Sequence, residues 1–232
     1  MRKIFWGLFL VFSFFITLPV SWWVLAKADF GYTFLYEKID ISAHIERYAP
    51  RNNKDKKDFL FTTKAERVNL FHGIVEAIHN KGEGLTDLLY GNEKKELLTN
   101  SEVIHLKDVA NLLDKLKPIL WIGLIFWLFF LIILRFKRMK LPPAKQLLIS
   151  AVLITLFLAV ILSLGPERVF NQLHVWVFPN NHQWFFYYEE SLMSTMMKAP
   201  DLFAYIAGIW ALISVVLTVL LLRLLKQLKI IF

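Results

Sequence analysis

Apolar and polar residues are arranged along this chain in long blocks, with four apolar runs separated by charged segments. The runs cover residues 4–26, 118–136, 146–165 and 202–222. Each has about 20 residues, which as an α-helix cross a hydrocarbon core of roughly 30 Å. Aromatic residues suited to the membrane interface lie near several of the ends: Trp22, Trp23, Trp121 and Tyr205. The pattern predicts four transmembrane helices.

The distribution of charge predicts their orientation. The two chain ends, the segment between the second and third runs, and Arg135 at the end of the second run together supply ten basic residues and no acidic ones. Segment 27–117 has 15 of each sign, and segment 166–201 has two basic and four acidic residues. Because basic residues collect on the cytoplasmic side, both termini are expected inside and both large segments outside. The net charge of +8 then reports topology and does not indicate binding to nucleic acid.

Residues 1–28 also allow a second interpretation, a cleaved secretory signal peptide. Their basic start, their apolar run and the small residues Ala26 and Ala28 resemble a signal-peptidase site. The apolar run is longer than the roughly 7–15 residues of a signal core, which favours a membrane helix. Under both interpretations the segment that follows lies outside.

The outer segments show weaker patterns. Aromatic and β-branched residues between Tyr32 and Ile45 predict short strands. Residues 62–79 are amphipathic and predict a helix, with Thr62 or Thr63 as N-cap and Glu66 in its first turn. Residues 85–98 predict a further helix or a turn.

The predicted fold class is membrane α-helical, a four-span transmembrane bundle with an extracytoplasmic cap that is mainly helical, or α+β. The expected parts are transmembrane helices at 1–26, 118–136, 146–165 and 202–222, an extracytoplasmic domain at 27–117, a cytoplasmic loop at 137–145, an interfacial outer loop at 166–201 and a cytoplasmic tail at 223–232.

A group of ionisable residues precedes the second apolar run, on a predicted helix that has Ser101 as a plausible N-cap. His105 lies one helical turn after Glu102 and one turn before Asp108, so either carboxylate can reach its imidazole. His174 lies beside the third run, on the same predicted side of the membrane. These two histidines are the candidate functional residues. For the other histidines we expect structural roles at His44, His72 and His79, and exposure at His182, which is close enough to His174 in sequence to assist it.

The loop 166–201 is rich in aromatic residues and is expected to lie at the level of the lipid headgroups. It ends in an apolar stripe at helical spacing, formed by Leu192, Met193, Met196 and Met197. Two interpretations of this stripe stand equally: an adaptable surface for an acyl chain, or ordinary packing against the outer domain.

Several classes of function lack their signatures. The chain has no cysteine, which excludes a thiol nucleophile and disulfides. It has no nucleophile elbow, phosphate-binding loop or H-E-x-x-H pair, so no serine hydrolase, nucleotide or metal site is expected. The interiors of the four apolar runs hold no acidic or basic residue, which argues against an ion transporter.

The order of these features resembles the bacterial lipoprotein intramolecular transacylase family, Lit. The resemblance rests on the topology and on two groups of residues: Glu102, His105, Asp108 and Val109 in the first outer segment, and His174, Phe178, Trp184 and Phe185 in the second.

The resemblance implies an enzyme of the bacterial cytoplasmic membrane that acts on diacylglyceryl-modified lipoproteins and contacts membrane lipids. The reaction moves the sn-2 acyl chain to the α-amine of the N-terminal cysteine and needs no cofactor and no metal. His105 and His174 would be catalytic, with Glu102 or Asp108 orienting His105. Substrate or lipid contacts would come from Trp176, Phe178, Trp184, Phe185, Met193, Met196 and Met197. The alternative is a non-enzymatic accessory protein that binds a lipid or a partner through its outer loops.

Overall fold

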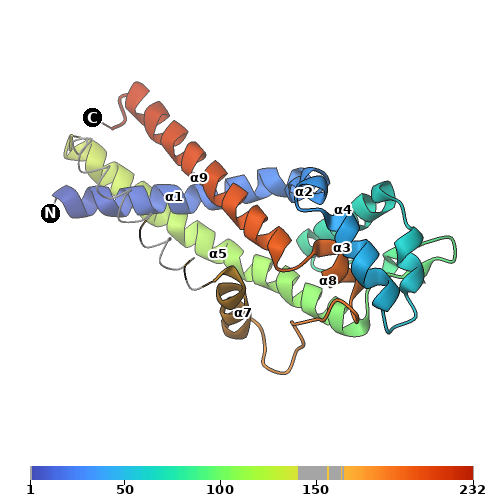
Figure 1. The fold of residues 1–232 in the computed structure, drawn as a ribbon. Helices are drawn as coiled ribbons and strands as arrows, with labels where there is room; N and C mark the ends of the chain where they lie inside the picture. Colours follow the sequence, from blue (N-terminus) through green and yellow to red (C-terminus); the bar gives the residue numbers. More distant parts are fainter. Residues whose placement is uncertain (1, 141–155, 157–162, 164, 232) are drawn as a thin grey trace. The chain divides into compact units, whose positions relative to one another are not determined.

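The computed structural model describes residues 2–140, 156, 163 and 165–231. The chain forms two compact units (Figure 1). Unit 1 comprises Met1–Val24, Leu116–Pro166 and Ala207–Phe232, and unit 2 comprises Leu25–Lys115 and Glu167–Ile206. The predicted third span at 146–165 and the cytoplasmic turn before it lie almost wholly outside the described residues.

Three described helices are long and apolar enough to cross a membrane: α1 (Arg2–Lys27), α5 (Asn100–Phe136) and α9 (Asp201–Gln227). They contain the predicted spans at 4–26, 118–136 and 202–222. In α5 the predicted outer helix and the predicted span are one continuous helix that passes through Pro118. The first half of α5 belongs to unit 2 and the second half to unit 1.

Aromatic side chains and small hydroxyls hold unit 1 together. Its core lies between α1, α5 and α9 and contains Trp6, Phe9, Trp127, Phe130, Leu134, Leu225 and Ile231. The indole of Trp127 donates to the Ser13 hydroxyl (2.9 Å), and the hydroxyls of Ser21 and Ser214 lie 2.6 Å apart. Small and hydroxyl side chains of this kind let membrane helices approach closely.

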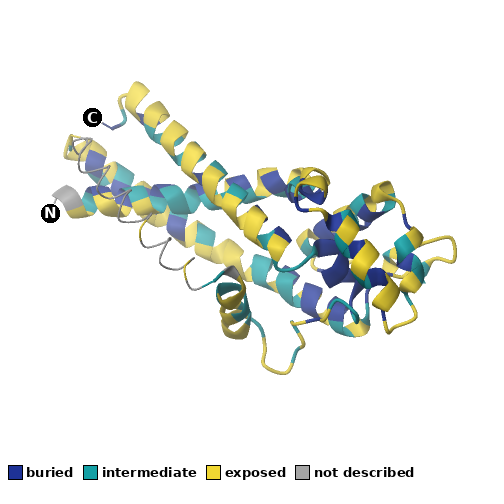
Figure 2. Cartoon of the chain, in the orientation of Figure 1, coloured by how far each residue is buried: buried dark blue, intermediate teal, exposed yellow. Residues whose placement is uncertain are grey.

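Unit 2 is mainly helical. It contains the ends of α1, α5 and α9 and the α-helices α2 (Tyr32–Lys38), α3 (Ile41–Tyr48), α4 (Lys64–His79), α7 (Pro166–Val177, with Pro166 in unit 1) and α8 (Leu192–Met197). Its 3₁₀ helices are η1 (Asp29–Gly31), η2 (Ala49–Arg51), η3 (Lys57–Phe61) and η4 (Leu85–Asp87). Its strands are β1 (Leu89–Tyr90) and β2 (Lys95–Glu96). Helix α8 is buried along its whole length (Figure 2).

The prediction of strands between Tyr32 and Ile45 is wrong, because this segment forms α2 and α3. Tyr32, Leu35, Tyr36 and Ile39 are all buried, and their spacing follows one face of a helix. The aromatic and β-branched composition suggested strands, but the helical period of burial decides the structure. The predicted helix at 62–79 is confirmed as α4, with the Thr63 hydroxyl accepting from the Glu66 amide at 3.2 Å.

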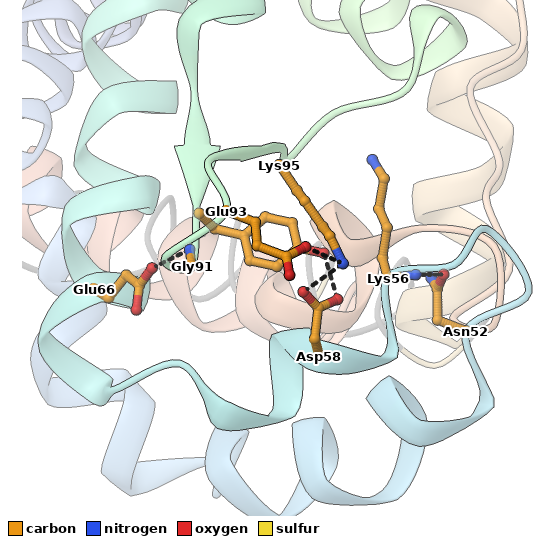
Figure 3. A network of polar contacts seen from close by, with 8 residues as sticks. Asn52, Lys56, Asp58, Glu66, Gly91, Glu93 and Lys95 are labelled. Carbon is orange, nitrogen blue, oxygen red and sulfur yellow. Dashed lines mark hydrogen bonds and ion pairs between the residues drawn. The ribbon is translucent and has the colours of Figure 1, made fainter.

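The segment predicted as a helix or turn at 85–98 is η4 followed by a short antiparallel hairpin, in which Leu89 pairs with Glu96. Polar contacts attach this hairpin to its surroundings (Figure 3). Asp58 accepts from the Tyr90 hydroxyl at 3.0 Å and from the Lys95 ammonium at 2.9 Å. The Lys56 ammonium donates to the Leu97 carbonyl at 3.1 Å, just before α5 begins.

Candidate active site

The two candidate histidines come together inside unit 2. His105 lies on the first half of α5 and His174 on α7, and their ring centroids are 6.0 Å apart. The Phe178 ring contacts both, at 4.9 Å from His105 and 5.1 Å from His174. Two segments far apart in the sequence therefore bring a pair of imidazoles into one aromatic environment.

The hydrogen bond of His174 fixes its neutral tautomer. Its Nδ1–H donates to the Phe170 carbonyl oxygen at 2.7 Å, and because a carbonyl only accepts, the lone pair of the neutral ring lies on Nε2. The rings of Phe170 and Trp184 lie 4.0 and 5.1 Å away. Burial lowers the pKa of His174, and the bond to Phe170 opposes this shift. The neutral imidazole of His174 thus presents Nε2 as an oriented acceptor nitrogen.

His105 is buried, with 8% of its surface exposed. Among the described residues its buried Nδ1 atom has no hydrogen-bond partner. Its surroundings are Phe178 and Phe186, with ring centroids at 4.9 and 5.9 Å. A buried polar atom without a partner costs stability, and such atoms are often retained for catalysis.

Glu102, one of the two predicted orienting carboxylates, binds other groups than His105. It is fully buried, and its two oxygens accept from the Thr99 amide and from the Ser191 hydroxyl, each at 2.5 Å. The Thr99 hydroxyl accepts in turn from the Glu102 amide at 3.4 Å, so the helix is capped by Thr99 and not by Ser101 as predicted. Burial lowers the pKa of Lys56, and the negative charge of Glu102 opposes that shift. Glu102 therefore ties the start of α5 to the start of α8.

Asp108, the other predicted orienting carboxylate, binds a third histidine. Its Oδ2 atom accepts from His182 Nδ1–H at 2.6 Å. His182 lies in the turn after α7, where its amide donates to the Pro179 carbonyl at 3.1 Å. Since Asp108 follows His105 by one helical turn, this bond brings His182 to the same end of unit 2 as the other two histidines.

The predicted lipid-contacting residues fall into two groups. Trp176 and Phe185 are exposed, and Phe178 and Trp184 contact the histidine rings. Met193, Met196 and Met197 are instead packed in the interior of unit 2 with 0–5% exposure, and the Tyr32 hydroxyl donates to the Met196 carbonyl at 2.8 Å. Of the two interpretations of the methionine stripe, ordinary packing against the outer domain agrees with this burial.

The remaining histidines have local roles. His72 lies on the surface and pairs with Asp29 at 2.8 Å and with Glu76 at 3.5 Å. His79 donates from Nδ1 to the Val75 carbonyl at 2.7 Å. His44 lies between the rings of Tyr48 and Tyr188, at 4.6 and 4.4 Å. In the part of the chain that the structure describes, no group of three His, Cys, Asp or Glu residues is arranged to hold a metal ion.

Three features of the candidate site were not predicted from the sequence. Phe170 precedes His174 by four residues, so the i, i+4 spacing could have identified it. Ser191 caps α8 while it binds Glu102, and a serine directly before an apolar helix was the available signal. The hydrogen bond between Asp108 and His182 joins positions 74 residues apart, and no local sequence pattern predicts it.

Comparison with known proteins identifies the family. The sequence model of the lipoprotein intramolecular transacylase Lit matches residues 4–200. No curated protein sequence matches the chain.

Three similar solved structures are of the membrane-integral Lit of Bacillus cereus. One, at 18% sequence identity and a TM-score of 0.63, covers 99% of this chain and 97% of its own. The others are variants in which one histidine is replaced, by arginine (19% identity, TM-score 0.62, 98% and 92% covered) or by alanine (19%, 0.63, 99% and 94%).

At this level of identity the likeness of the structures concerns the fold, that of an integral, multi-pass membrane protein. The family itself is given by the sequence match, which spans most of the chain including the two outer segments. The chain therefore belongs to the Lit family of lipoprotein intramolecular transacylases, enzymes that make lyso-form lipoproteins.

Proposed function

We propose that the transacylation takes place at the pair formed by His105 and His174. The observation that carries this proposal is the 6.0 Å separation of their rings, with His174 Nε2 free by tautomer and His105 Nδ1 buried without a partner among the described residues. The family's reaction moves an ester-linked acyl chain to the α-amine of an N-terminal cysteine in the same molecule. It needs an acceptor for a proton of the amine and a donor for the developing oxyanion.

Each imidazole has one of these tasks. The neutral amine attacks the ester carbonyl and a carbon–nitrogen bond forms. His174 accepts the proton of the attacking nitrogen at Nε2 and returns it to the glycerol oxygen as the carbon–oxygen bond breaks. His105 donates an N–H to the oxyanion of the tetrahedral intermediate. Because donor and acceptor belong to one molecule, holding them in place supplies a high effective concentration.

The supporting residues complete the site. Glu102 holds the first turn of α5, which carries His105, against α8. The aromatic side chains of Phe178 and Trp184 exclude water beside the two rings, and the exposed Trp176 and Phe185 contact acyl chains or lipid headgroups. The substrates are diacylglyceryl-modified lipoproteins.

The membrane arrangement follows the predicted parts. Four spans, with both termini in the cytoplasm and the segments 27–117 and 166–201 outside, are supported by α1, α5 and α9 and by the ten basic residues of the inner segments. The fourth span, at 146–165, stays a prediction from the sequence, because that segment lies almost wholly outside the described residues. Cysteine labelling at Asn53 and Lys140 in whole cells tests this topology, since only the first position should react from outside.

The direct test of the site replaces each histidine in cells that lack any other enzyme that N-acylates lipoproteins. His105→Ala and His174→Ala should each reduce lyso-lipoprotein formation by about 10²–10⁴-fold, measured by mass spectrometry of a reporter lipoprotein. The double variant should be little worse than either single one, because both residues serve one step. His72→Ala is the matched control and should keep full activity. Full activity of either site variant at normal expression would refute the role of that histidine.

A further inference from the structure

His182 and Asp108 form a hydrogen-bonded dyad, and Asp108 lies one turn of α5 after His105. The bond from His182 Nδ1–H to Asp108 Oδ2 is 2.6 Å long, and it leaves the lone pair of the neutral imidazole on Nε2. The side chain of His182 is 34% exposed and that of Asp108 is 15% exposed. The dyad thus combines an oriented acceptor nitrogen with a partly exposed imidazole, whereas His105 is buried and His174 half-buried.

The position of the dyad is fixed from two sides. Asp108 follows His105 by one turn of α5, which places their side chains on one face of the helix. His182 follows Phe178 by four residues, and Phe178 contacts the rings of both His105 and His174. The loop that carries His182 is therefore held against α5 close to the reacting groups.

The proton balance of the reaction calls for a group of this kind. An α-amine with a pKa of about 7.7–8.0 is mostly an ammonium ion at neutral pH. An ammonium and an ester give an amide, an alcohol and one additional proton. A pair that takes a proton from the attacking nitrogen and returns it to the glycerol oxygen has no net uptake, so the additional proton has to leave by another group.

The two histidines of the proposed pair, of which His105 is buried and His174 half-buried, are less suited to that removal. His105 is 8% exposed, so a proton taken up there has no direct path to water. Burial lowers the pKa of His174, which makes proton transfer from an ammonium to this ring unfavourable. The side chain of His182 is 34% exposed, and its Nδ1 contacts the Asp108 carboxylate.

We propose that His182 accepts the proton of the substrate's α-ammonium at Nε2 and passes it to water, while Asp108 fixes its tautomer and orientation. One N–H bond of the ammonium breaks, one N–H bond forms at Nε2, and the neutral amine then attacks the ester. The inference rests on the function proposed above, and it gives His182 a step that precedes the one served by His105 and His174.

His182→Asn separates this role from a purely structural one. The asparagine amide can keep the hydrogen bond to Asp108, since its N–H₂ takes the place of Nδ1–H, but it has no basic nitrogen. The full-length protein in nanodiscs is assayed with a synthetic peptide whose N-terminal cysteine carries a dipalmitoylglyceryl group, and the lyso product is measured by mass spectrometry at pH 6.5 and pH 9.

The expected result depends on pH. At pH 6.5 only about 3–6% of the α-amine is neutral, so His182→Asn should be roughly 15- to 30-fold slower than the wild type. At pH 9 the amine is already neutral and the variant should come within about twofold. The titratable groups that α5 and α7 bring to this place are Asp108, His105 and His174. They are present in both proteins, so the ratio of the two rates isolates the effect of His182.

The other outcomes are equally decisive. Wild-type rates for His182→Asn at both pH values would overturn the inference, and an equal loss at both would assign His182 a structural role only. His182→Ala shows whether the asparagine preserves the loop, since it should lose more thermal stability than His182→Asn if it does. An active His105→Ala would instead refute the proposed function, so the two failures can be told apart.

Discussion

Units 1 and 2 differ in the kinds of polar side chain that they bury. Among the described residues of unit 1, the buried polar groups are hydroxyls and indoles, as in the bonds of Ser21 with Ser214 and of Trp127 with Ser13. In unit 2 ionisable side chains are buried, including Arg67 at 5% exposure and Glu102 at 0%. A membrane helix satisfies its own backbone and needs only neutral links to its neighbours, whereas unit 2 also buries ionisable side chains that depend on specific hydrogen-bond partners.

The difference is also visible at the surface. In α9 only 11% of the most apolar stretch is buried, as expected of a helix that faces lipid (Figure 2). In unit 2 the apolar helix α8 is buried throughout. The stability of unit 1 should therefore respond weakly to the loss of a single polar group, and that of unit 2 strongly.

The largest effect should come from Arg67, whose guanidinium makes three hydrogen bonds to neutral acceptors. It donates to the Thr62 hydroxyl and the Tyr36 hydroxyl at 2.8 Å, and to the Leu60 carbonyl at 3.0 Å. Arg67→Ala leaves these acceptors unpaired and should lower the free energy of unfolding by about 3 kcal/mol. Arg67→Lys should restore little of this free energy, because a lysine ammonium cannot reproduce the planar set of N–H donors of the guanidinium. Thermal unfolding in detergent measures both.

Arg47→Ala is the control for this comparison. Arg47 is exposed and lies 5.4 Å from the Tyr48 ring, a contact worth at most about 1 kcal/mol. If Arg67→Ala were no more destabilising than Arg47→Ala, the buried charge would not hold unit 2 together and the contrast between the units would be wrong.

The same contrast explains what the sequence could predict. Length and apolarity are sufficient to find a membrane helix, and the predicted spans at 4–26, 118–136 and 202–222 all lie in long helices. In unit 2 the individual elements of secondary structure were predicted only where the local sequence signal is strong, as at Thr63, the N-cap of α4. The helices α2 and α3 were missed because the composition of their residues favours strands while their spacing favours a helix.

The candidate site shows the same limit. His105 and His174 were identified from their places beside apolar runs, and their rings do meet. The partners of the nearby carboxylates were not identified, because Ser191 is 89 residues from Glu102 and His182 is 74 residues from Asp108. Such contacts depend on the tertiary fold, which spacing along one helix does not describe.

A smaller effect is expected at Gly123, where α5 approaches α1 in unit 1. A Cβ atom added there would lie 2.3 Å from Cε1 of Phe15, so the ring would have to move. Gly123→Ala should cost about 1–3 kcal/mol by overpacking, and the second change Phe15→Leu should restore part of it. Gly208→Ala in α9 is the matched control, since a Cβ there meets nothing within 4 Å. Equal thermal unfolding of the two alanine variants would show that the close approach is not required.

The smallest effect should come from Ser214, whose hydroxyl links α9 to α1. Its Oγ donates to the Trp210 carbonyl at 2.7 Å and lies 2.6 Å from the Ser21 hydroxyl. Hydrogen bonds between membrane helices contribute about 0.6 kcal/mol on average and at most about 1.7, because a polar group freed in the membrane finds other partners. Ser214→Ala should therefore cost about a fifth of what Arg67→Ala costs. A double-mutant cycle with Ser21→Ala isolates the link, and a coupling energy above about 2 kcal/mol would mean that unit 1 also depends on specific polar contacts.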